Sequence, residues 1–301
     1  MSESVVEVLG LTRRFGATAA LASVSLSIPR GAVYGLVGEN GAGKTTLIKH
    51  ILGLLRAESG SVRVFDRDPV ADPVGVLSRI GYLSEENDLP EWMRVDELIL
   101  YARAFRPTWD DGYAEELREA FSLDPAARVG SLSRGQRARA GLLVALAYRP
   151  ELLVLDEPSS GLDPIVRKDI LEAIIHTIAH EGRTVLFSSH LLDEVERVAD
   201  RVTMISRGKV ALSAPLSDLR ESHRCVTVRF VEPTSGPPAV AGVLRWDGAG
   251  REWTAVCRDG AGELRSAVAG WGAAVIAERG PSLEEIFVAH AGVRATSAAD
   301  G

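Results

Sequence analysis

A glycine-rich stretch that ends in Lys-Thr-Thr constrains this 301-residue chain more than any other feature. It fits the pattern G-x-x-x-x-G-K-[ST], in which glycines let backbone N–H groups turn towards a polyanion and the lysine adds a cation. An apolar run suited to a buried strand precedes it at 32–37, and a helical pattern follows at 46–52. A helix N-terminus that faces phosphates is the context this pattern requires. We therefore predict a nucleotide site formed by Gly38, Glu39, Asn40, Gly41, Ala42, Gly43, Lys44, Thr45 and Thr46.

Composition indicates a globular protein, with 46% apolar and 25% charged residues. The net charge of −7 and the lack of a dense Lys/Arg block argue against a nucleic-acid partner. Cys225 and Cys257 are too few for a disulfide scaffold or a metal knuckle. No secretory signal is recognisable, and no apolar run approaches the roughly 20 residues that cross a bilayer. We expect a soluble chain whose membrane role, if it has one, needs a separate partner.

The distribution of apolar residues predicts an α/β fold with a mostly parallel sheet. Alternating residues at 5–9 and 21–28 indicate an antiparallel β entry, and a helical pattern dominates 91–128. Strands alternate with helices over 136–209, which is typical of a parallel sheet. After this stretch the sequence pattern changes to that of short strands and two helices. We predict a nucleotide-binding domain at 1–218 with a helical subdomain at about 88–148, a small α+β accessory domain at 219–290, and a disordered tail at 291–301.

Two carboxylates follow the apolar run that starts at Leu152. A buried strand would deliver Asp156 to its carboxyl end, where open α/β sheets bind ligands. In phosphate-loop enzymes a carboxylate at this place helps to hold Mg²⁺, and the Thr45 hydroxyl is suited to the same ion. Glu157 comes next and can orient or deprotonate an attacking water.

The order of motifs resembles that of the nucleotide-binding subunits of ABC transporters over residues 5–210. Ser133-Arg134-Gly135-Gln136 resembles the family's signature motif, although alone it would be an ordinary helix cap. Ser160–Asp163 is similar to the loop after the catalytic glutamate, and His190 resembles the switch histidine at the γ-phosphate. Phe15 looks like the aromatic that stacks on adenine, with a half-buried core position as the alternative.

The resemblance implies an ABC ATPase core of the P-loop NTPase class that uses ATP and Mg²⁺. Two such domains pair head to tail, as a homo- or heterodimer, with ATP between one phosphate loop and Ser133, Gly135 and Gln136 of the other subunit. Asp163 would lie at this interface. The implied catalytic residues are Lys44, Glu157 and His190, and the implied metal ligands are Thr45, Glu85 and Asp156.

Two residues depart from the family pattern. Glu85 stands where family members often carry Gln, so it adds negative charge near the γ-phosphate; we expect weaker ATP affinity or a steeper Mg²⁺ dependence than with Gln. Arg134 replaces the usual second glycine of the signature motif. Its guanidinium either lends a cation to phosphate or is solvated.

Two further stretches bear on the partner. Leu89, Pro90, Trp92 and Met93 correspond to the surface that receives a membrane partner's coupling helix in this family, with packing inside the helical subdomain as the alternative. Residues 279–287 resemble the tail of ATPase subunits that serve ABC-2-type exporters. The resemblance therefore implies an ATPase on the cytoplasmic face of the membrane, bound to ABC-2-type transmembrane permease subunits. The alternatives are a soluble ABC-type ATPase acting on ribosomes or DNA, and a regulatory module with little turnover.

Overall fold

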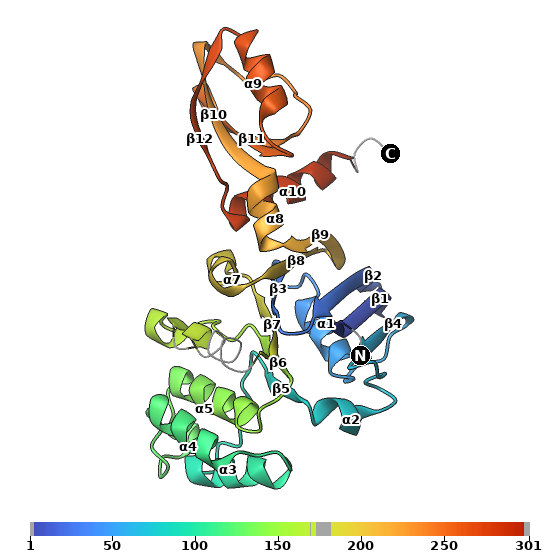
Figure 1. Ribbon diagram of the computed structural model, residues 1–301, viewed down its shortest axis with the longest axis vertical. Helices are drawn as coiled ribbons and strands as arrows, with labels where there is room; N and C mark the ends of the chain where they lie inside the picture. Colours follow the sequence, from blue (N-terminus) through green and yellow to red (C-terminus); the bar gives the residue numbers. More distant parts are fainter. Residues whose placement is uncertain (1–2, 169, 173–181, 298–301) are drawn as a thin grey trace. The chain divides into compact units, whose positions relative to one another are not determined.

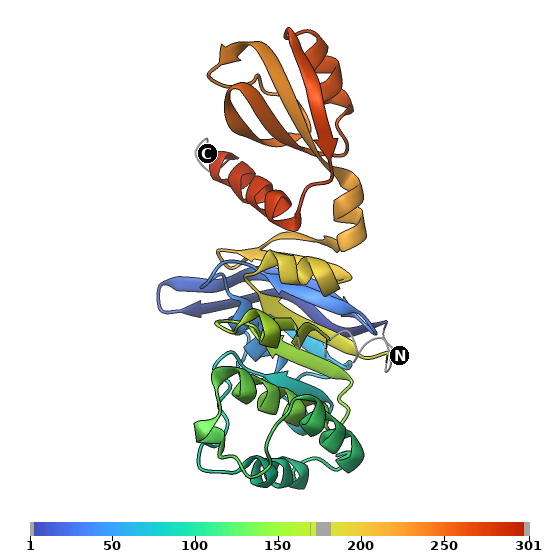
Figure 2. The ribbon, with the colours of Figure 1, turned by 90° about the vertical axis from the view of Figure 1, so that its left-hand side faces the viewer.

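The computed structural model describes residues 3–168, 170–172 and 182–297. The chain divides into two compact units, Met1–Val210 and Ala211–Gly301, so the division falls before the expected boundary at 218. Figure 1 labels the elements of both units and Figure 2 shows the same ribbon from the side. Among the helices of the described ranges, none is long and apolar enough to span a bilayer.

The first unit is built on a sheet with the order β5-β6-β7-β3-β8-β9, whose last strand, β9, begins in this unit and continues past Val210. Neighbouring strands from β5 to β8 run parallel, which confirms the expected mostly parallel sheet. The strands β3, β6 and β7 are buried along their whole length, as is usual for a parallel sheet covered on both faces. These strands are β3 (Val33–Val37), β5 (Ile80–Leu83), β6 (Leu152–Asp156), β7 (Thr184–Ser189), β8 (Arg201–Ser206) and β9 (Lys209–Pro215).

A second, antiparallel sheet of the same unit has the order β2-β1-β4. Its strands are β1 (Ser4–Phe15), β2 (Thr18–Pro29) and β4 (Ser59–Val64), and the first two confirm the predicted β entry. The helix α1 (Lys44–Ile51) contacts both sheets. Its apolar residues join one buried cluster with side chains of both sheets, so the helix that begins at the phosphate loop is fixed from two sides (Figure 1).

Three helices form the helical subdomain of the first unit (Figure 1): α3 (Val95–Ala104), α4 (Asp111–Ala120) and α5 (Arg134–Leu146). Helix α5 contacts β5, α3 and α4, so it joins this subdomain to the sheet. The side chain of Trp92 is 70% exposed, whereas Met93 is only 5% exposed. Of the four residues expected on the partner surface, Met93 therefore belongs to the core, as the alternative of packing inside the subdomain has it, whereas Trp92 is exposed and Leu89 and Pro90 are partly exposed.

Several elements were not predicted or were predicted only in part. The short helices α2 (Pro73–Leu77) and α7 (Leu192–Val198) flank the sheet, the second within the stretch where helices were expected to alternate with strands. Within 136–209, where strands and helices are expected to alternate, residues 164–168 and 170–172 are helical, and residues 169 and 173–181 lie outside the described residues.

The second unit consists of α8 (Leu216–Ser222) and a three-stranded antiparallel sheet, β11-β10-β12, with two further helices. The strand β11 (Val243–Arg258) is one 16-residue strand, whereas the sequence predicted short strands in this region. Helices α9 (Gly262–Ala269) and α10 (Leu283–Ser297) pack on opposite faces of this sheet (Figure 2). Cys257 lies in a buried cluster with residues of α9, whereas Cys225 lies in a separate cluster with a residue of α10. Helix α10 continues to Ser297, so residues 291–297 are not the expected tail. The remaining strands are β10 (His223–Thr234) and β12 (Ala273–Arg279).

Candidate nucleotide site

The phosphate loop lies between β3 and α1, as its sequence context requires. Gly43 precedes the helix with a φ of 111°, a conformation open mainly to glycine. A Cβ on Gly38 would lie 2.3 Å from the Ile205 carbonyl oxygen, so only glycine fits there as well. The loop is thus held in a shape that presents the first N–H groups of α1 to an anion.

A cavity of about 330 Å³ opens over this loop. It brings together residues from the loop, from the end of β6 and from the segment after β5, which are far apart in the sequence. The expected site residues that line it are Asn40, Gly41, Gly43, Lys44, Thr45, Thr46, Glu85 and Glu157, and Ala20 completes it. Glu39 is exposed beside it and Ala42 is buried in the core cluster.

Lys44 and Glu157 form a buried ion pair at the base of this cavity. Lys44 Nζ lies 3.0 Å from Glu157 Oε1, and the two side chains are 5% and 6% exposed. The ammonium also donates to the carbonyl oxygens of Gly38 at 2.6 Å and Glu39 at 3.2 Å. A buried charge needs such partners, because its desolvation is costly otherwise.

The second oxygen of the Glu157 carboxylate is held by His190. The distance from His190 Nδ1 to Glu157 Oε2 is 2.7 Å, and the backbone N–H of His190 donates to the same oxygen at 3.3 Å. Glu157 has a φ of 48°, which is uncommon outside glycine and places its side chain between Lys44 and His190. The structure thus joins the three expected catalytic residues in one chain of contacts.

Ser188 connects the two neighbouring carboxylates. Its hydroxyl donates to Asp156 Oδ1 at 2.7 Å and accepts from the Glu157 N–H at 2.9 Å. Asp156 is 1% exposed at the carboxyl end of β6. The sequence reasoning missed this role of Ser188; the only signal was a short polar residue at the end of an apolar strand next to His190.

The signature-like segment opens α5 and contributes to a different cavity. Ser133 Oγ accepts from Gln136 N at 3.2 Å while Gln136 Oε1 accepts from Ser133 N at 3.0 Å, which is a capping box. The Ser133 hydroxyl hydrogen stays available to a further acceptor. Gly135 packs closely against Val166, since a Cβ there would lie 2.7 Å from that side chain. None of these three signature residues lines the cavity over the chain's own phosphate loop.

The guanidinium of Arg134 lies against the loop that follows Glu157. A Cβ on Gly161 would be 2.3 Å from Arg134 Nη1, and Gly161 has a φ of +65°. Arg134 also lines a cavity of about 450 Å³ together with Glu85, Glu157 and Ser160. The side chain therefore supports the 160–163 loop of its own chain, where the sequence left a phosphate contact or solvation open.

Phe15 and Asp163 are both exposed where a second molecule can reach them. The Phe15 ring is 49% exposed at the end of β1, and the Arg13 guanidinium lies 4.9 Å from its centroid. It is therefore no core residue, and its free face can stack on a planar ring. Asp163 Oδ1 accepts from the N–H groups of Ile165 and Val166 and so caps the helical segment that follows.

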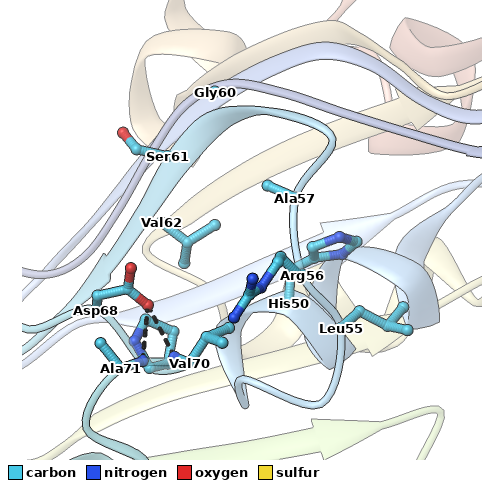
Figure 3. Close-up of a pocket in the computed structure, with 11 residues that line it drawn as sticks. His50, Leu55, Arg56, Ala57, Gly60, Ser61, Val62, Asp68, Val70 and Ala71 are labelled. Atoms are coloured by element: carbon cyan, nitrogen blue, oxygen red, sulfur yellow. Dashed lines mark hydrogen bonds between the residues drawn. The ribbon is translucent and has the colours of Figure 1, made fainter.

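A further cavity of about 290 Å³ lies at the other end of α1 (Figure 3). His50, Arg56 and Asp68 line it, and Asp68 accepts from the N–H groups of Val70 and Ala71. No expected site residue lies there. The expected residues instead line the cavity at the N-terminal end of α1.

Comparisons with known proteins identify the family of this chain. The family profile described as "ABC transporter" matches residues 21–160, which include the phosphate loop, the signature-like segment and both carboxylates. The chain belongs to the ABC transporter family and is an ATP-binding ATPase of that family.

Particular relatives extend the comparison. The bacitracin transport ATP-binding protein BcrA of Bacillus licheniformis is 32% identical over 224 residues, 73% of each chain. The daunorubicin/doxorubicin resistance ATP-binding protein DrrA of Streptomyces peucetius is 33% identical over 222 residues, 72% of this chain and 67% of the other. YtrB of Bacillus subtilis, an ABC transporter ATP-binding protein, is 27% identical over 288 residues, 96% and 98% of the two chains. A solved ATP-binding subunit of an ABC transporter superimposes with a TM-score of 0.67 at 28% identity, over 72% of this chain and 92% of that one.

Proposed function

We propose that this chain is the ATP-hydrolysing subunit of an ABC-2-type exporter, bound at the cytoplasmic face of the membrane to separate permease subunits. The proposal of ATP hydrolysis rests on one observation, namely that Glu157 contacts both Lys44 and His190. Similarity to proteins whose names refer to bacitracin transport and daunorubicin resistance supports export.

Each residue of the phosphate site has a role in this proposal. The backbone of 38–46 and Lys44 hold the phosphates of ATP. Mg²⁺ prefers oxygen ligands and usually keeps waters and substrate phosphates. The Thr45 hydroxyl and Glu85 line the cavity and Asp156 lies buried at the end of β6, so the donor set fits this ion. Bound there, Mg²⁺ would neutralise charge that develops on the phosphates.

Glu157 is the proposed base that orients or deprotonates the attacking water, and His190 holds its carboxylate. Lys44 contacts Glu157 and two loop carbonyls. To reach the phosphates, the ammonium has to exchange at least one of these contacts. This exchange would free one oxygen of Glu157 for the water at the moment when ATP is bound.

The site needs a second subunit to be complete in this proposal. Ser133, Gly135 and Gln136 of one subunit meet ATP on the phosphate loop of the other, and Phe15 stacks on adenine. The exposed Ser133 hydroxyl and its absence from the chain's own phosphate cavity support this arrangement. Asp163 would lie at the same interface.

The permease is proposed to dock on the surface that includes Leu89, Pro90 and Trp92. Trp92 is 70% exposed and the other two residues are partly buried beside it in the sequence. An exposed aromatic residue of this size is typical of the centre of a protein interface.

A pull-down tests the proposed function. Tagged Glu157→Gln should retain ATP without hydrolysing it, so membranes are solubilised in mild detergent with ATP and Mg²⁺ and the co-purifying chains are identified. Recovery of a polytopic membrane protein, lost in a Lys44→Ala variant, is the expected result. Recovery of ribosomes, of DNA or of no other chain would contradict the exporter assignment.

A further inference from the structure

A buried carboxyl group on α7 connects the two segments that carry Glu157 and His190. Glu194 is 4% exposed, and its Oε2 accepts hydrogen bonds from Ser159 Oγ at 2.5 Å and Ser189 Oγ at 3.4 Å. Ser159 follows Glu157 by two positions and Ser189 directly precedes His190. A single side chain thus holds the backbone on both sides of the Glu157–His190 contact.

The buried carboxyl group of Glu194 is unfavourable for the stability of the fold. Burial raises the pKa of Glu194, and within the described residues its Oε1 is buried without a hydrogen-bond partner. A buried polar atom without a partner is destabilising, because it loses its hydrogen bonds to water and gains none in return. An apolar side chain at this position of α7 would avoid that penalty, so the carboxyl group calls for a reason other than stability.

Glu194 lies outside the groups that meet nucleotide. It lines neither the cavity over the phosphate loop nor the cavity beside Arg134. Its two partners are themselves buried, with Ser159 1% and Ser189 0% exposed. Any effect of Glu194 on hydrolysis must therefore pass through the backbone segments that these serines belong to.

We propose that Glu194 is a positioning residue for ATP hydrolysis, which ties the segment after Glu157 to the segment before His190. The inference rests on the proposed hydrolysis at Glu157. Ser159 also directly precedes the 160–163 loop, so the same hydrogen bond sets where that loop begins. The backbone strain at Glu157, with its φ of 48°, needs such support from neighbouring contacts.

The expected signature is a loss of turnover without a loss of nucleotide binding. Misplacing a catalytic group by about 1 Å can reduce the rate by roughly 100-fold. Residues 38–46 hold the phosphates from β3 and α1, which Glu194 does not contact through any of these hydrogen bonds. The kcat should therefore fall while the Kd for ATP stays the same.

The experiment uses the full chain and measures kcat, KM and, separately, the Kd for a fluorescent ATP analogue. Glu194→Ala and Ser159→Ala should each lower kcat by about tenfold or more with Kd changed by less than about twofold. Glu194→Gln keeps an oxygen acceptor for Ser159 and should retain most of the activity. Asp193→Ala, an exposed neighbour on α7, is the matched control and should behave as the wild type.

A double-variant cycle separates positioning from general destabilisation. Glu194→Ala combined with Ser159→Ala should be little worse than either alone, because both remove the same hydrogen bond. Any of three results would overturn the positioning role. These are a wild-type kcat in Glu194→Ala, a Glu194→Gln variant no more active than Glu194→Ala, or losses of ATP affinity and thermal stability as large as the loss of kcat. If the wild-type chain itself hydrolysed no ATP, the proposed function would fail and this inference with it, so the two failures are distinguishable.

Discussion

Lys44 and Glu157 are ion-paired at 3.0 Å in the interior of the site, although each is expected to act on a different part of the reaction. In the proposed mechanism the ammonium acts at the phosphates and the carboxylate at the attacking water. While they neutralise one another, neither is free for that role. The proposal therefore couples nucleotide binding and the release of the base through one contact.

This coupling predicts opposite effects of Glu157→Gln on turnover and on affinity. Without its carboxylate, kcat should fall by about 100-fold or more, since a general base contributes roughly that much. The affinity for ATP should rise a few fold, because Lys44 no longer has an anionic competitor for the phosphates. Equilibrium binding and a phosphate-release assay measure the two quantities. Lys44→Ala is the control and should lose affinity; an unchanged or weaker affinity in Glu157→Gln would refute the competition.

The phosphate site could be predicted from sequence because its main parts are local. Gly38 to Thr46 lie within one strand–loop–helix unit, and Asp156 and Glu157 end one apolar strand. The family resemblance implied roles for Glu157 and His190 but not their contact, which joins residues 33 positions apart. The link from Ser159 to Glu194 spans 35 positions and carries no spacing pattern, so no sequence rule could reveal it.

The fold was predictable to a similar degree. Long periodic runs such as those at β2 and α5 were recognised, whereas the four-residue strand β5 was too short to show a period. The order β5-β6-β7-β3-β8-β9 depends on packing between distant strands. For Met93 the sequence left surface docking and packing inside the subdomain open, because an apolar residue next to Trp92 gives no sign of which side it faces.

Glu85→Gln should strengthen ATP binding. Glu85 is exposed and lines the cavity over the phosphate loop, so its charge faces the phosphates and is only partly screened. We expect the Kd for ATP to fall by about two- to fivefold, the size of an exposed charge interaction, or the Mg²⁺ dependence to become less steep. Glu86→Gln is the matched control, because Glu86 lines the cavity beside Arg134 but not the cavity over the phosphate loop. If both variants kept wild-type affinity and Mg²⁺ dependence, the charge of Glu85 would have no role.

Arg134→Gly should lower kcat by a few fold without changing the Kd for ATP. The guanidinium packs on Gly161, so its removal frees the 160–163 loop that follows Glu157. Arg134→Lys separates the two possible roles. A cation that serves phosphate could be replaced by lysine, whereas a planar group packed on a loop could not. Steady-state kinetics of both variants decide: full activity in Arg134→Lys would favour the phosphate contact, and wild-type kcat in Arg134→Gly would exclude both.

Trp92→Ala should abolish binding of the membrane partner and spare the basal ATPase. Truncation of an aromatic residue at the centre of an interface often costs about 2 kcal/mol or more. The pull-down described above measures partner recovery, and the isolated chain reports the ATPase. Leu9→Ala removes an exposed apolar side chain from the antiparallel sheet and serves as the control. Partner recovery equal to that of the wild type would remove Trp92 from the docking surface.

We expect the second unit to lose stability as the pH falls, because of contacts at the start of α10. The Glu285 carboxylate is paired with the Arg279 guanidinium and accepts a hydrogen bond from Ser282 N at 2.8 Å. Together these contacts lower the pKa of Glu285 to about 2. A carboxyl group whose folded-state pKa is depressed stabilises the fold above its usual pKa of 4.5, and this contribution is lost as the pH falls towards 2.

Glu285→Gln tests this dependence. The variant should unfold a few degrees lower than the wild type at pH 7, and the difference should shrink steadily below about pH 4.5. Thermal unfolding followed by circular dichroism between pH 3 and pH 7 would measure it, with Glu284→Gln, an exposed neighbour on α10, as the control. Because Glu285 is one-third exposed, added salt should weaken the effect at pH 7. A difference that stayed constant across this pH range would mean that the carboxylate charge does not stabilise the helix start.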